Sequence, residues 1–255
     1  MQFSIIQEQT LPSTNAILKE MAKGGAPEGT VLVALRQTAG YGRHGRSFFS
    51  PEGTGLYFSL LLRPSFAAAD APHLTPLAAV ALALAVERLF PVRAEIKWVN
   101  DLYLDGKKAA GILSESALGT DGALAYTVVG VGVNLLPPVG GFPEGLLATA
   151  LLPEGGEPSR AEALREALLA AFLEEFAIRY EKMPRLDFLT EYRRRSFLDG
   201  RRVLVHNAAI DTAKTGKGRP ALVLGITESG ALAVRYEDGR EDVLCAGEVT
   251  LRLGE

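Results

Sequence analysis

The chain has 255 residues, of which 47% are hydrophobic and 22% are charged. This composition is typical of a folded globular protein and excludes disordered, collagen-like and disulfide-stapled classes. The 27 Lys and Arg residues nearly balance the 30 Asp and Glu residues, so the net charge of -3 provides no overall attraction to nucleic acid or anionic lipid. Any chemistry that depends on charge must therefore come from local clusters.

The cysteine and histidine content predicts a protein without a dedicated metal site. Cys245 is the single cysteine and lies in an apolar stretch, so we expect a small buried hydrophobe in a reducing compartment. His44, His73 and His206 are far apart in the sequence.

The N-terminus lacks the pattern of a secretion signal, and the longest apolar run, residues 77–86, is about half of the ~20 residues that span a bilayer. We expect a cytoplasmic protein without a membrane segment.

The first half of the chain alternates between apolar runs and glycine-rich turns. A helix is expected from residue 14 to about 23, where Gly24 and Gly25 end it. A polar, glycine-rich loop is expected at residues 37–55, and Asp105-Gly106 predicts the turn of a hairpin. An Ala/Leu-rich helix is expected at 77–89, and apolar runs predict strands at residues 31–35, 56–62, 96–98, 103–104, 109–115 and 126–135.

In the second half of the chain, the residue pattern changes from one typical of helices to one typical of strands. After a loop rich in Pro and Gly at 137–158, apolar residues recur every four positions up to Tyr180, and Pro184 ends that helix. A second helix is expected to run through about Phe197. Beyond Gly200, a small barrel is predicted by five short runs, at residues 203–205, 222–226, 231–236, 242–245 and 249–253. We therefore predict two domains, residues 1–199 and 200–255.

The loop after the second apolar run contains Gly40, Gly42 and Gly45, which match the G-x-G-x-x-G pattern of dinucleotide-binding folds. No helix is expected to open from the third glycine, because proline and glycine follow it, and no acidic residue stands about 20 positions later. The pattern is therefore weak support for a dinucleotide site.

The charge of this loop is more informative. Residues 29–51 contain Arg36, Arg43, Arg46 and His44 but no Asp or Glu. Glycine lets backbone N–H groups approach a ligand, and arginine donates forked hydrogen bonds to phosphate or carboxylate. The loop therefore fits anion recognition, and a solvated surface loop is the alternative.

A second polar cluster lies at residues 97–116, around two short strands. Taken alone, it fits a charged hairpin whose lysines lie in water. Its charged and amide residues are Lys97, Asn100, Asp101, Lys107 and Lys108.

Together the two segments resemble a known family. GYGRHGR followed by SFFSPEGTGLYFSLLLRP and then KWVNDLYLDGKKAAGILSE is similar to the biotin protein ligase family, and the similarity extends from PSTN at residues 12–15 to VGVGVNL at 129–135 and into the C-terminal part. The resemblance implies an α+β fold, with a catalytic domain like that of class II aminoacyl-tRNA synthetases, a mixed sheet flanked by helices, and a small C-terminal SH3-like barrel.

The resemblance also implies a two-step activity. Biotin and ATP give biotinyl-5'-AMP and pyrophosphate, and biotin then passes to a specific lysine of the biotin carboxyl carrier protein of a biotin-dependent carboxylase. The carboxylate of biotin is ionised at neutral pH and needs cations, including Mg²⁺ with ATP, more than a general base. By similarity, Arg43 and Arg46 approach the phosphates and carboxylate, Lys108 contacts the carboxylate and the reacting phosphate, and Lys97 is a further phosphate contact.

The same resemblance assigns the remaining ligand contacts. The neutral ureido head of biotin needs donors and acceptors, although Ser13 and Thr14 could equally cap a helix. The biotin contacts implied are Ser13, Thr14, Asn15, Gln37, Tyr41, Gly42 and Gly111. The further ATP contacts implied are Asn100, Asn134 and Phe48, which stands where the family usually has tryptophan.

Asp101 has two interpretations. In the transfer step it could orient the acceptor lysine or accept its proton. It could instead form a structural ion pair with Lys97 or Lys108.

Two competing functions are weighed against this one. Lipoyl or octanoyl transferases resemble the domain distantly, but the cationic loop and the KWVND segment favour biotin. A repressor would need an N-terminal DNA-binding domain, for which we expect no room before Pro12. The resemblance implies a homodimer. Nucleic-acid binding is not expected, because an arginine cluster without interleaved aromatics fits a solvated face or a carrier contact better; its members are Arg193, Arg194, Arg195, Arg201 and Arg202.

Overall fold

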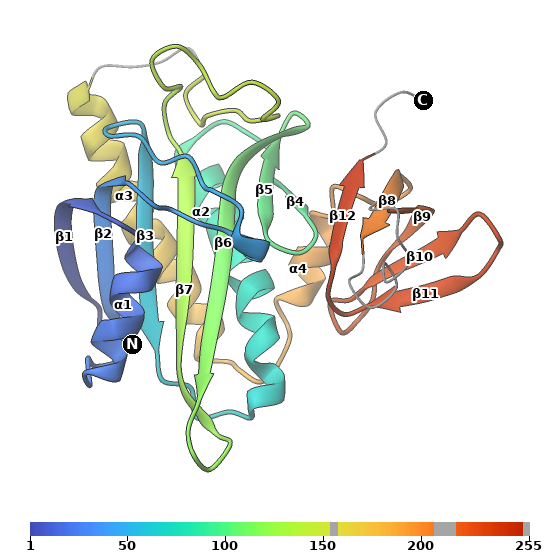
Figure 1. Ribbon diagram of the computed structural model, residues 1–255, viewed down its shortest axis with the longest axis horizontal. Helices are drawn as coiled ribbons and strands as arrows, with labels where there is room; N and C mark the ends of the chain where they lie inside the picture. The colour runs from blue at the N-terminus through green and yellow to red at the C-terminus, as the bar shows by residue number, and fades with distance from the viewer. Residues whose placement is uncertain (154–157, 207–217, 252–255) are drawn as a thin grey trace.

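The computed structural model describes residues 1–153, 158–206 and 218–251, with the side chains of 158–160 left out. A seven-stranded sheet carries helices on both faces, and a separate five-stranded sheet follows it (Figure 1). Strands and helices thus form separate layers of an α+β fold, as the sequence predicts. The division into residues 1–199 and 200–255 stays a prediction.

The large sheet is mixed. Its strand order is β1-β2-β3-β7-β6-β5-β4, and β1 runs parallel to β2 whereas every other neighbouring pair is antiparallel. The expected Asp105-Gly106 hairpin is confirmed, because both residues have the positive φ angles of a primed turn. The strands are β1 (Ser4–Leu11), β2 (Thr30–Gln37), β3 (Gly55–Leu62), β4 (Glu95–Lys97), β5 (Asp101–Leu104), β6 (Lys107–Leu118) and β7 (Leu124–Asn134).

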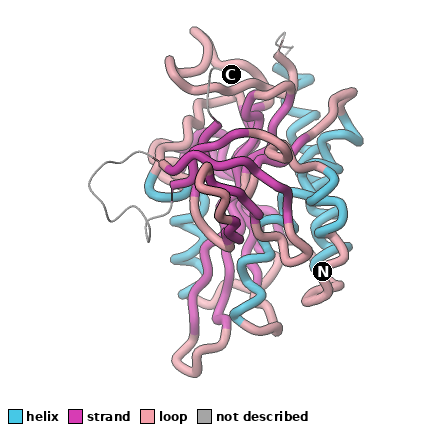
Figure 2. The backbone as a smooth tube through the Cα atoms, turned by 90° about the vertical axis from the view of Figure 1, so that its right-hand side faces the viewer, coloured by secondary structure: helices cyan, strands magenta, loops and turns pink. Residues whose placement is uncertain are grey.

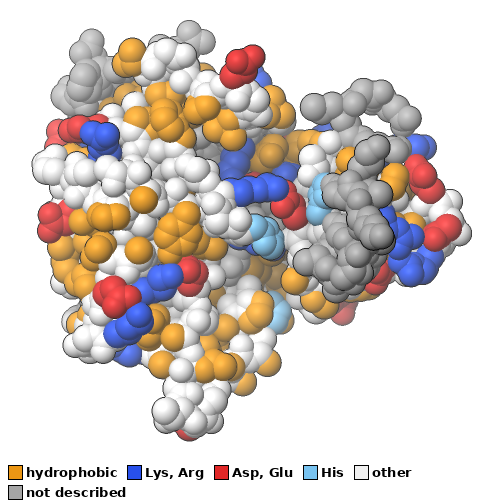
Figure 3. All heavy atoms as spheres, viewed as in Figure 1, with side chains coloured by type: hydrophobic (Ala, Val, Ile, Leu, Met, Phe, Trp, Pro, Cys, Tyr) orange, Lys and Arg blue, Asp and Glu red, His pale blue; other side chains and the backbone are white. Residues whose placement is uncertain are grey.

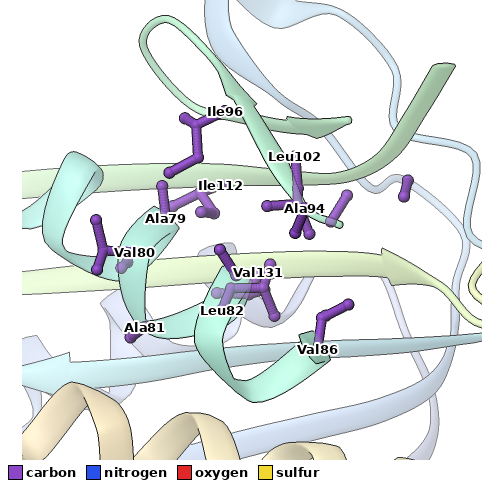
Figure 4. Packing of buried hydrophobic residues seen from close by; sticks show 14 of the residues in the cluster. Ala79, Val80, Ala81, Leu82, Val86, Ala94, Ile96, Leu102, Ile112 and Val131 are labelled. Atoms are coloured by element: carbon purple, nitrogen blue, oxygen red, sulfur yellow. The ribbon is translucent and has the colours of Figure 1, made fainter. Parts of the chain in front are cut away.

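One face of this sheet carries the main core. Helix α2 (Leu74–Leu89) lies between the sheet and α3 (Pro158–Tyr180), and it is buried along most of its length. Figure 4 shows Leu82 of this helix close to Val131 of β7, and Ala79 close to Ile112 of β6. The segment Ala68–Leu89 is long and apolar enough to cross a membrane, but 67% of its hydrophobic window is buried inside the protein. Its apolar surface is therefore accounted for by packing between two layers.

The opposite face of the sheet is covered only in part, by α1 (Thr14–Lys23). Leu18 and Ala22 of this helix pack on Leu32, Leu61 and Val128. The helix begins where the sequence predicts, because the Ser13 Oγ atom accepts a hydrogen bond from the Ala16 amide at 3.4 Å. Beyond the N-terminus of α1, the loop at residues 37–50 lies over this face of the sheet, where Phe48 contacts Gly132.

The C-terminal sheet is antiparallel throughout, with the order β11-β10-β9-β8-β12. Figure 2 views the molecule from the side of this sheet and shows its short strands in front of the long ones. Trp98 Nε1 donates to Gly230 O at 3.1 Å, and the two sheets share one hydrophobic core. Residues 252 and 253 of the last predicted run lie outside the described residues. The strands are β8 (Arg202–His206), β9 (Arg219–Ile226), β10 (Leu232–Tyr236), β11 (Glu241–Leu244) and β12 (Glu248–Leu251).

Cys245 differs from its prediction. The side chain is exposed, not buried. It follows the buried Leu244 at the end of β11, an edge strand, where the chain bends away from the core. An apolar neighbourhood in the sequence therefore did not place this residue inside, because alternate residues of a half-buried strand face opposite sides.

Arg195 corrects a second expectation, since the arginine cluster around α4 (Leu189–Arg194) is not uniformly solvated. Arg195 is 5% exposed, and its Nη1 and Nη2 atoms donate to the two carboxylate oxygens of Glu87 at 2.6 and 2.7 Å. Its Nε donates to Glu191 at 2.7 Å, and hydrogen bonds from Arg194 and charges of both arginines hold the pKa of Glu191 at about 2. Hydrogen bonds from Arg195 also lower the pKa of Glu87.

The first prediction concerns this ion pair. Arg195→Ala should lower the free energy of unfolding by about 3 kcal/mol, because it leaves the Glu87 carboxylate without its bidentate partner. Arg194→Ala is the matched control, since Arg194 is largely exposed and its pair with Glu191 is worth less than about 1 kcal/mol. Urea unfolding followed by circular dichroism measures both. Equal losses in the two variants would contradict the structural role of Arg195.

Candidate active site

Four antiparallel strands bring one cross-strand row of residues to the partly covered face of the sheet. Lys97 of β4 pairs with Asp101 of β5, Asp101 with Gly111 of β6, and Gly111 with Gly132 of β7. Cross-strand partners share a face, so the cation, the carboxylate and two positions without a side chain lie side by side. A Cβ atom on Gly132 would overlap the Phe48 ring, and one on Gly111 would lie 3.3 Å from it. The two glycines therefore make the floor on which Phe48 rests.

The neighbouring row repeats this arrangement for Asn15. Ser59 of β3 pairs with Gly130 of β7, and Gly130 pairs with Leu113 of β6. A Cβ atom on Gly130 would overlap Asn15 Oδ1, which lies 2.6 Å from Ser59 Oγ. We did not identify Gly130 and Gly132 from the sequence as site residues. The alternation of valine and glycine in β7 could have revealed them. Glycines at every second position leave one face of a strand without side chains, and a ligand or another segment can lie there.

These rows form the floor of a cavity of about 410 Å³. In the view of Figure 3, basic side chains and histidine gather in the hollow between the large sheet and the C-terminal sheet. The cavity wall includes every predicted site residue except Asn134: Ser13, Thr14, Asn15, Gln37, Tyr41, Gly42, Arg43, Arg46, Phe48, Lys97, Asn100, Asp101, Lys108 and Gly111.

One end of the cavity is polar and uncharged. Gln37 Oε1 accepts from the Thr14 amide at 2.9 Å and lies 3.2 Å from Thr14 Oγ1, and Gln37 Nε2 donates to Ser50 Oγ at 3.1 Å. Ser13 uses an oxygen lone pair to cap α1, which leaves its hydroxyl proton for a ligand. The helix-capping role and a ligand-binding role of Ser13 are therefore compatible.

The other end is cationic. Lys108 Nζ lies 2.7 Å from Asp101 Oδ1 and 5.8 Å from the centroid of the Phe48 ring. The lysine and aspartate side chains are only 26% and 16% exposed. The ion pair that Asp101 makes is with Lys108, which was one of the two partners considered from the sequence.

Lys97 differs from the other cations of the site. Burial lowers its pKa, the charge of Asp101 raises it, and the charge of Lys108 lowers it. Its Nζ atom lies 5.8 Å from the centroid of the Tyr103 ring, and burial raises the pKa of Tyr103 to about 12. Desolvation thus makes the Lys97 ammonium a stronger attractor for an incoming anion than an exposed lysine would be.

The C-terminal sheet contributes to the same cavity. Arg43 Nη2 donates to Gly247 O at 2.8 Å, and Arg46 Nη1 lies 2.5 Å from Glu248 Oε1. Glu248, Val249 and Thr250 also line the wall. No local pattern could have revealed these contacts, because about 200 residues separate the loop from β12.

The two predicted asparagines are placed differently. Asn100 lines the cavity, and its Nδ2 atom donates to Ile112 O at 2.8 Å. Asn134 does not reach the cavity wall, since its Nδ2 donates to Thr149 O at 3.0 Å at the end of β7. Its observed contacts are those of packing at the end of a strand.

The second prediction concerns Lys97. In a ¹³C-methylated sample followed by NMR, its amine should titrate at lower pH than that of Lys23, because burial lowers one pKa whereas a hydrogen bond to Glu20 raises the other. Asp101→Asn should move the Lys97 titration lower still, since it removes a charge that raises the pKa. A Lys97 titration at or above that of Lys23 would contradict the desolvated site.

The chain is similar in sequence to known proteins. Residues 7–134 match the family model described as Biotin/lipoate A/B protein ligase family. The chain is 34% identical, over 93% of its length and 96% of the relative, to the biotin--[acetyl-CoA-carboxylase] ligase of Paracoccus denitrificans. It is 39% identical over 168 residues to the bifunctional ligase/repressor BirA of Bacillus subtilis (strain 168), and that match spans 65% of the chain but only about half, 51%, of the relative.

A solved structure covers nearly the whole chain. The biotin protein ligase from Aquifex aeolicus in complex with biotin and ATP has a TM-score of 0.73 and 28% sequence identity, over 98% of both chains. The structural similarity thus includes the strands and loops that form the cavity, and the family match covers half of the sequence. The chain therefore belongs to the biotin/lipoate A/B protein ligase family.

Proposed function

We propose that the protein is an ATP-dependent biotin protein ligase, which forms biotinyl-5'-AMP and then transfers biotin to a lysine of the biotin carboxyl carrier protein of a biotin-dependent carboxylase. The observation that carries the proposal is one cavity with a neutral polar end and a cationic end. Biotin has a neutral ureido head and an anionic carboxylate, which such a cavity matches. The names of the relative from Paracoccus denitrificans and of the structure from Aquifex aeolicus support the same substrates.

The polar end suits the ureido head. Ser13 has a hydroxyl proton to donate, and Gln37 has a second amide proton after its bond to Ser50. Asn15 Oδ1 has a second lone pair beside its contact with Ser59. A ureido group donates two N–H bonds and accepts at its oxygen, so these remaining positions complement it.

The cationic end suits adenylation. The biotin carboxylate attacks the α-phosphorus of ATP, the new C–O–P linkage forms, and the bond to pyrophosphate breaks. Lys108, Lys97 and Arg43 bring two anions together and stabilise the added charge on the phosphoryl oxygens. Phe48, held over the glycine floor, provides an aromatic face for adenine.

Magnesium is proposed to arrive with the nucleotide. Among the described residues, no group of three His, Cys, Asp or Glu side chains is placed to hold a metal ion. The carboxylates on the cavity wall, Asp101 and Glu248, are each paired with a cation. Mg²⁺ prefers oxygen ligands and keeps its waters, so phosphate oxygens fit it better than these residues do.

The transfer step needs a neutral amine. The acceptor lysine attacks the acyl carbon of the mixed anhydride, the C–N bond forms, and AMP leaves. Asp101 accepts the proton from the lysine ammonium or orients the amine, because its carboxylate lies at the cavity wall beside Lys108.

We also propose that the protein is a cytoplasmic homodimer and that it has no repressor role.

A mass measurement tests the proposed function. Protein given biotin and MgATP should acquire the mass of biotinyl-AMP in native mass spectrometry, and apo carrier added next should gain one biotin. Lipoate and octanoate serve as competing acids, since the family model includes lipoate ligases. Absence of adenylate and of carrier modification with biotin would overturn the proposal, and a preference for lipoate would replace its substrate.

The third prediction tests Lys108. Lys108→Ala should slow adenylate formation by about 100-fold or more, because it removes a preorganised cation from the reacting phosphate. Lys107→Ala is the matched control, since Lys107 is its exposed neighbour and does not line the cavity. Single-turnover release of pyrophosphate measures both. A rate near that of the unmodified protein would exclude the assigned role of Lys108.

The fourth prediction separates the two steps. Asp101→Asn should slow transfer to the carrier more than adenylate formation, since only transfer requires loss of a proton from an amine. Quenched-flow measurement of each step, starting from preformed biotinyl-AMP for the second, gives the two rates. If both steps slow by the same factor, the carboxylate has only the structural role of pairing with Lys108.

A further inference from the structure

Glu115 of β6 joins three segments just outside the cavity wall. Its Oε1 atom accepts from Lys19 Nζ at 2.6 Å. Its Oε2 atom accepts from Asn15 Nδ2 at 2.9 Å and from Tyr41 Oη at 2.8 Å. One carboxylate therefore holds the first turns of α1, the loop at residues 37–50 and strand β6 together.

The charge of Glu115 strengthens these contacts. Burial raises its pKa, but the hydrogen bonds from Lys19, Asn15 and Tyr41 outweigh burial and leave the pKa below its usual value. The side chain is 26% exposed and stays ionised at neutral pH. Hydrogen bonds to a carboxylate are about twice as strong as those between neutral groups. Lys19 also lies 5.5 Å from the centroid of the Tyr41 ring, which adds a second contact between α1 and the loop.

Glu115 determines how the Asn15 amide is oriented. Asn15 Nδ2 faces Glu115 and Leu113 O, at 2.9 and 3.3 Å, and both of these partners can only accept. Asn15 Oδ1 must therefore point the other way, toward Ser59 and the space above Gly130. Asn15 lines the cavity, whereas Glu115 does not. The carboxylate thus acts on the cavity through another residue.

Tyr41 connects the same carboxylate to the loop. The loop closes on itself through a bridge between Tyr41 and Ser47 and a bond from the Gly42 amide to Arg46 O at 2.7 Å. The bond from Tyr41 to Glu115 ties this closed turn to β6. Loss of this bond would remove the side-chain link between the turn and β6 without changing Lys108 or Asp101.

We propose that Glu115 is a positioning residue for the neutral head of the acid substrate, and that it sets biotin affinity rather than the rate of the phosphoryl step. The inference rests on the proposed function. It follows from the placement of Glu115 behind Asn15 and Tyr41, at the opposite end of the cavity from the ion pair of Lys108 and Asp101.

Glu115→Gln tests the inference because it keeps the size of the side chain and removes its charge. We expect the Kd for biotin, measured by calorimetry, and the KM for biotin to rise about tenfold, since an amide cannot accept from all three donors. We expect kcat at saturating biotin to change less than about twofold. Glu20→Gln is the matched control, since Glu20 forms an exposed ion pair with Lys23 on the same helix. It should leave both constants unchanged.

A double-mutant cycle tests the route through Tyr41. Tyr41→Phe alone should raise the Kd several-fold, and the double variant should bind biotin no more weakly than Glu115→Gln does. If Glu115→Gln fails to fold, as judged by its thermal melting curve, Tyr41→Phe still tests the contact with Glu115 intact.

Three results would overturn the inference. The first is an unchanged Kd for biotin in Glu115→Gln or in Tyr41→Phe. The second is a lower kcat at constant KM in Glu115→Gln. The third is a double variant whose increase in Kd equals the product of the increases in the two single variants. Failure of the unmodified protein to bind biotin would instead remove the proposed function, and the inference with it.

Discussion

The structure of the site depends on an absence of side chains on one face of the central strands. Gly130 and Gly132 alternate with Val129, Val131 and Val133, which point into the core against α2. The valines make the sheet a firm platform, and the glycines leave room above it. Phe48 and Asn15 occupy that room, so two segments from the first fifth of the chain reach the centre of the sheet.

Electrostatics of the cavity follow from this placement. Lys97 and Lys108 lie close to the floor, where burial is sufficient to lower the pKa of Lys97. Asp101 is the cross-strand partner of Lys97 and forms an ion pair with Lys108. At the opposite end, the Glu115 carboxylate accepts hydrogen bonds from Asn15 and Tyr41 and orients the Asn15 amide. The net charge of -3 conceals this separation of a cationic end from a neutral one.

The C-terminal sheet belongs functionally with the large sheet. Residues of β12 line one side of the cavity, Gly247 just before β12 accepts a hydrogen bond from Arg43, and Glu248 pairs with Arg46. The two sheets also share a hydrophobic core. The ion pair of Arg46 with Glu248 of β12 ties the loop to the C-terminal sheet.

The sequence by itself determined the family and the α+β fold class. It also determined a set of candidate site residues, all of which except Asn134 line the cavity. It could do so because these residues lie in short motifs, at 12–15, 37–48 and 97–111, whose backbone conformation is set locally by glycines, turns and a helix cap. Only the tertiary structure decided which lysine pairs with Asp101, that Asn134 does not line the cavity, that Cys245 is exposed and that Arg195 is buried. The contributions of Glu115 and of β12 also depend on contacts between segments far apart in the chain. Side-chain burial and ion pairing are properties of such contacts, and no pattern along one segment contains them.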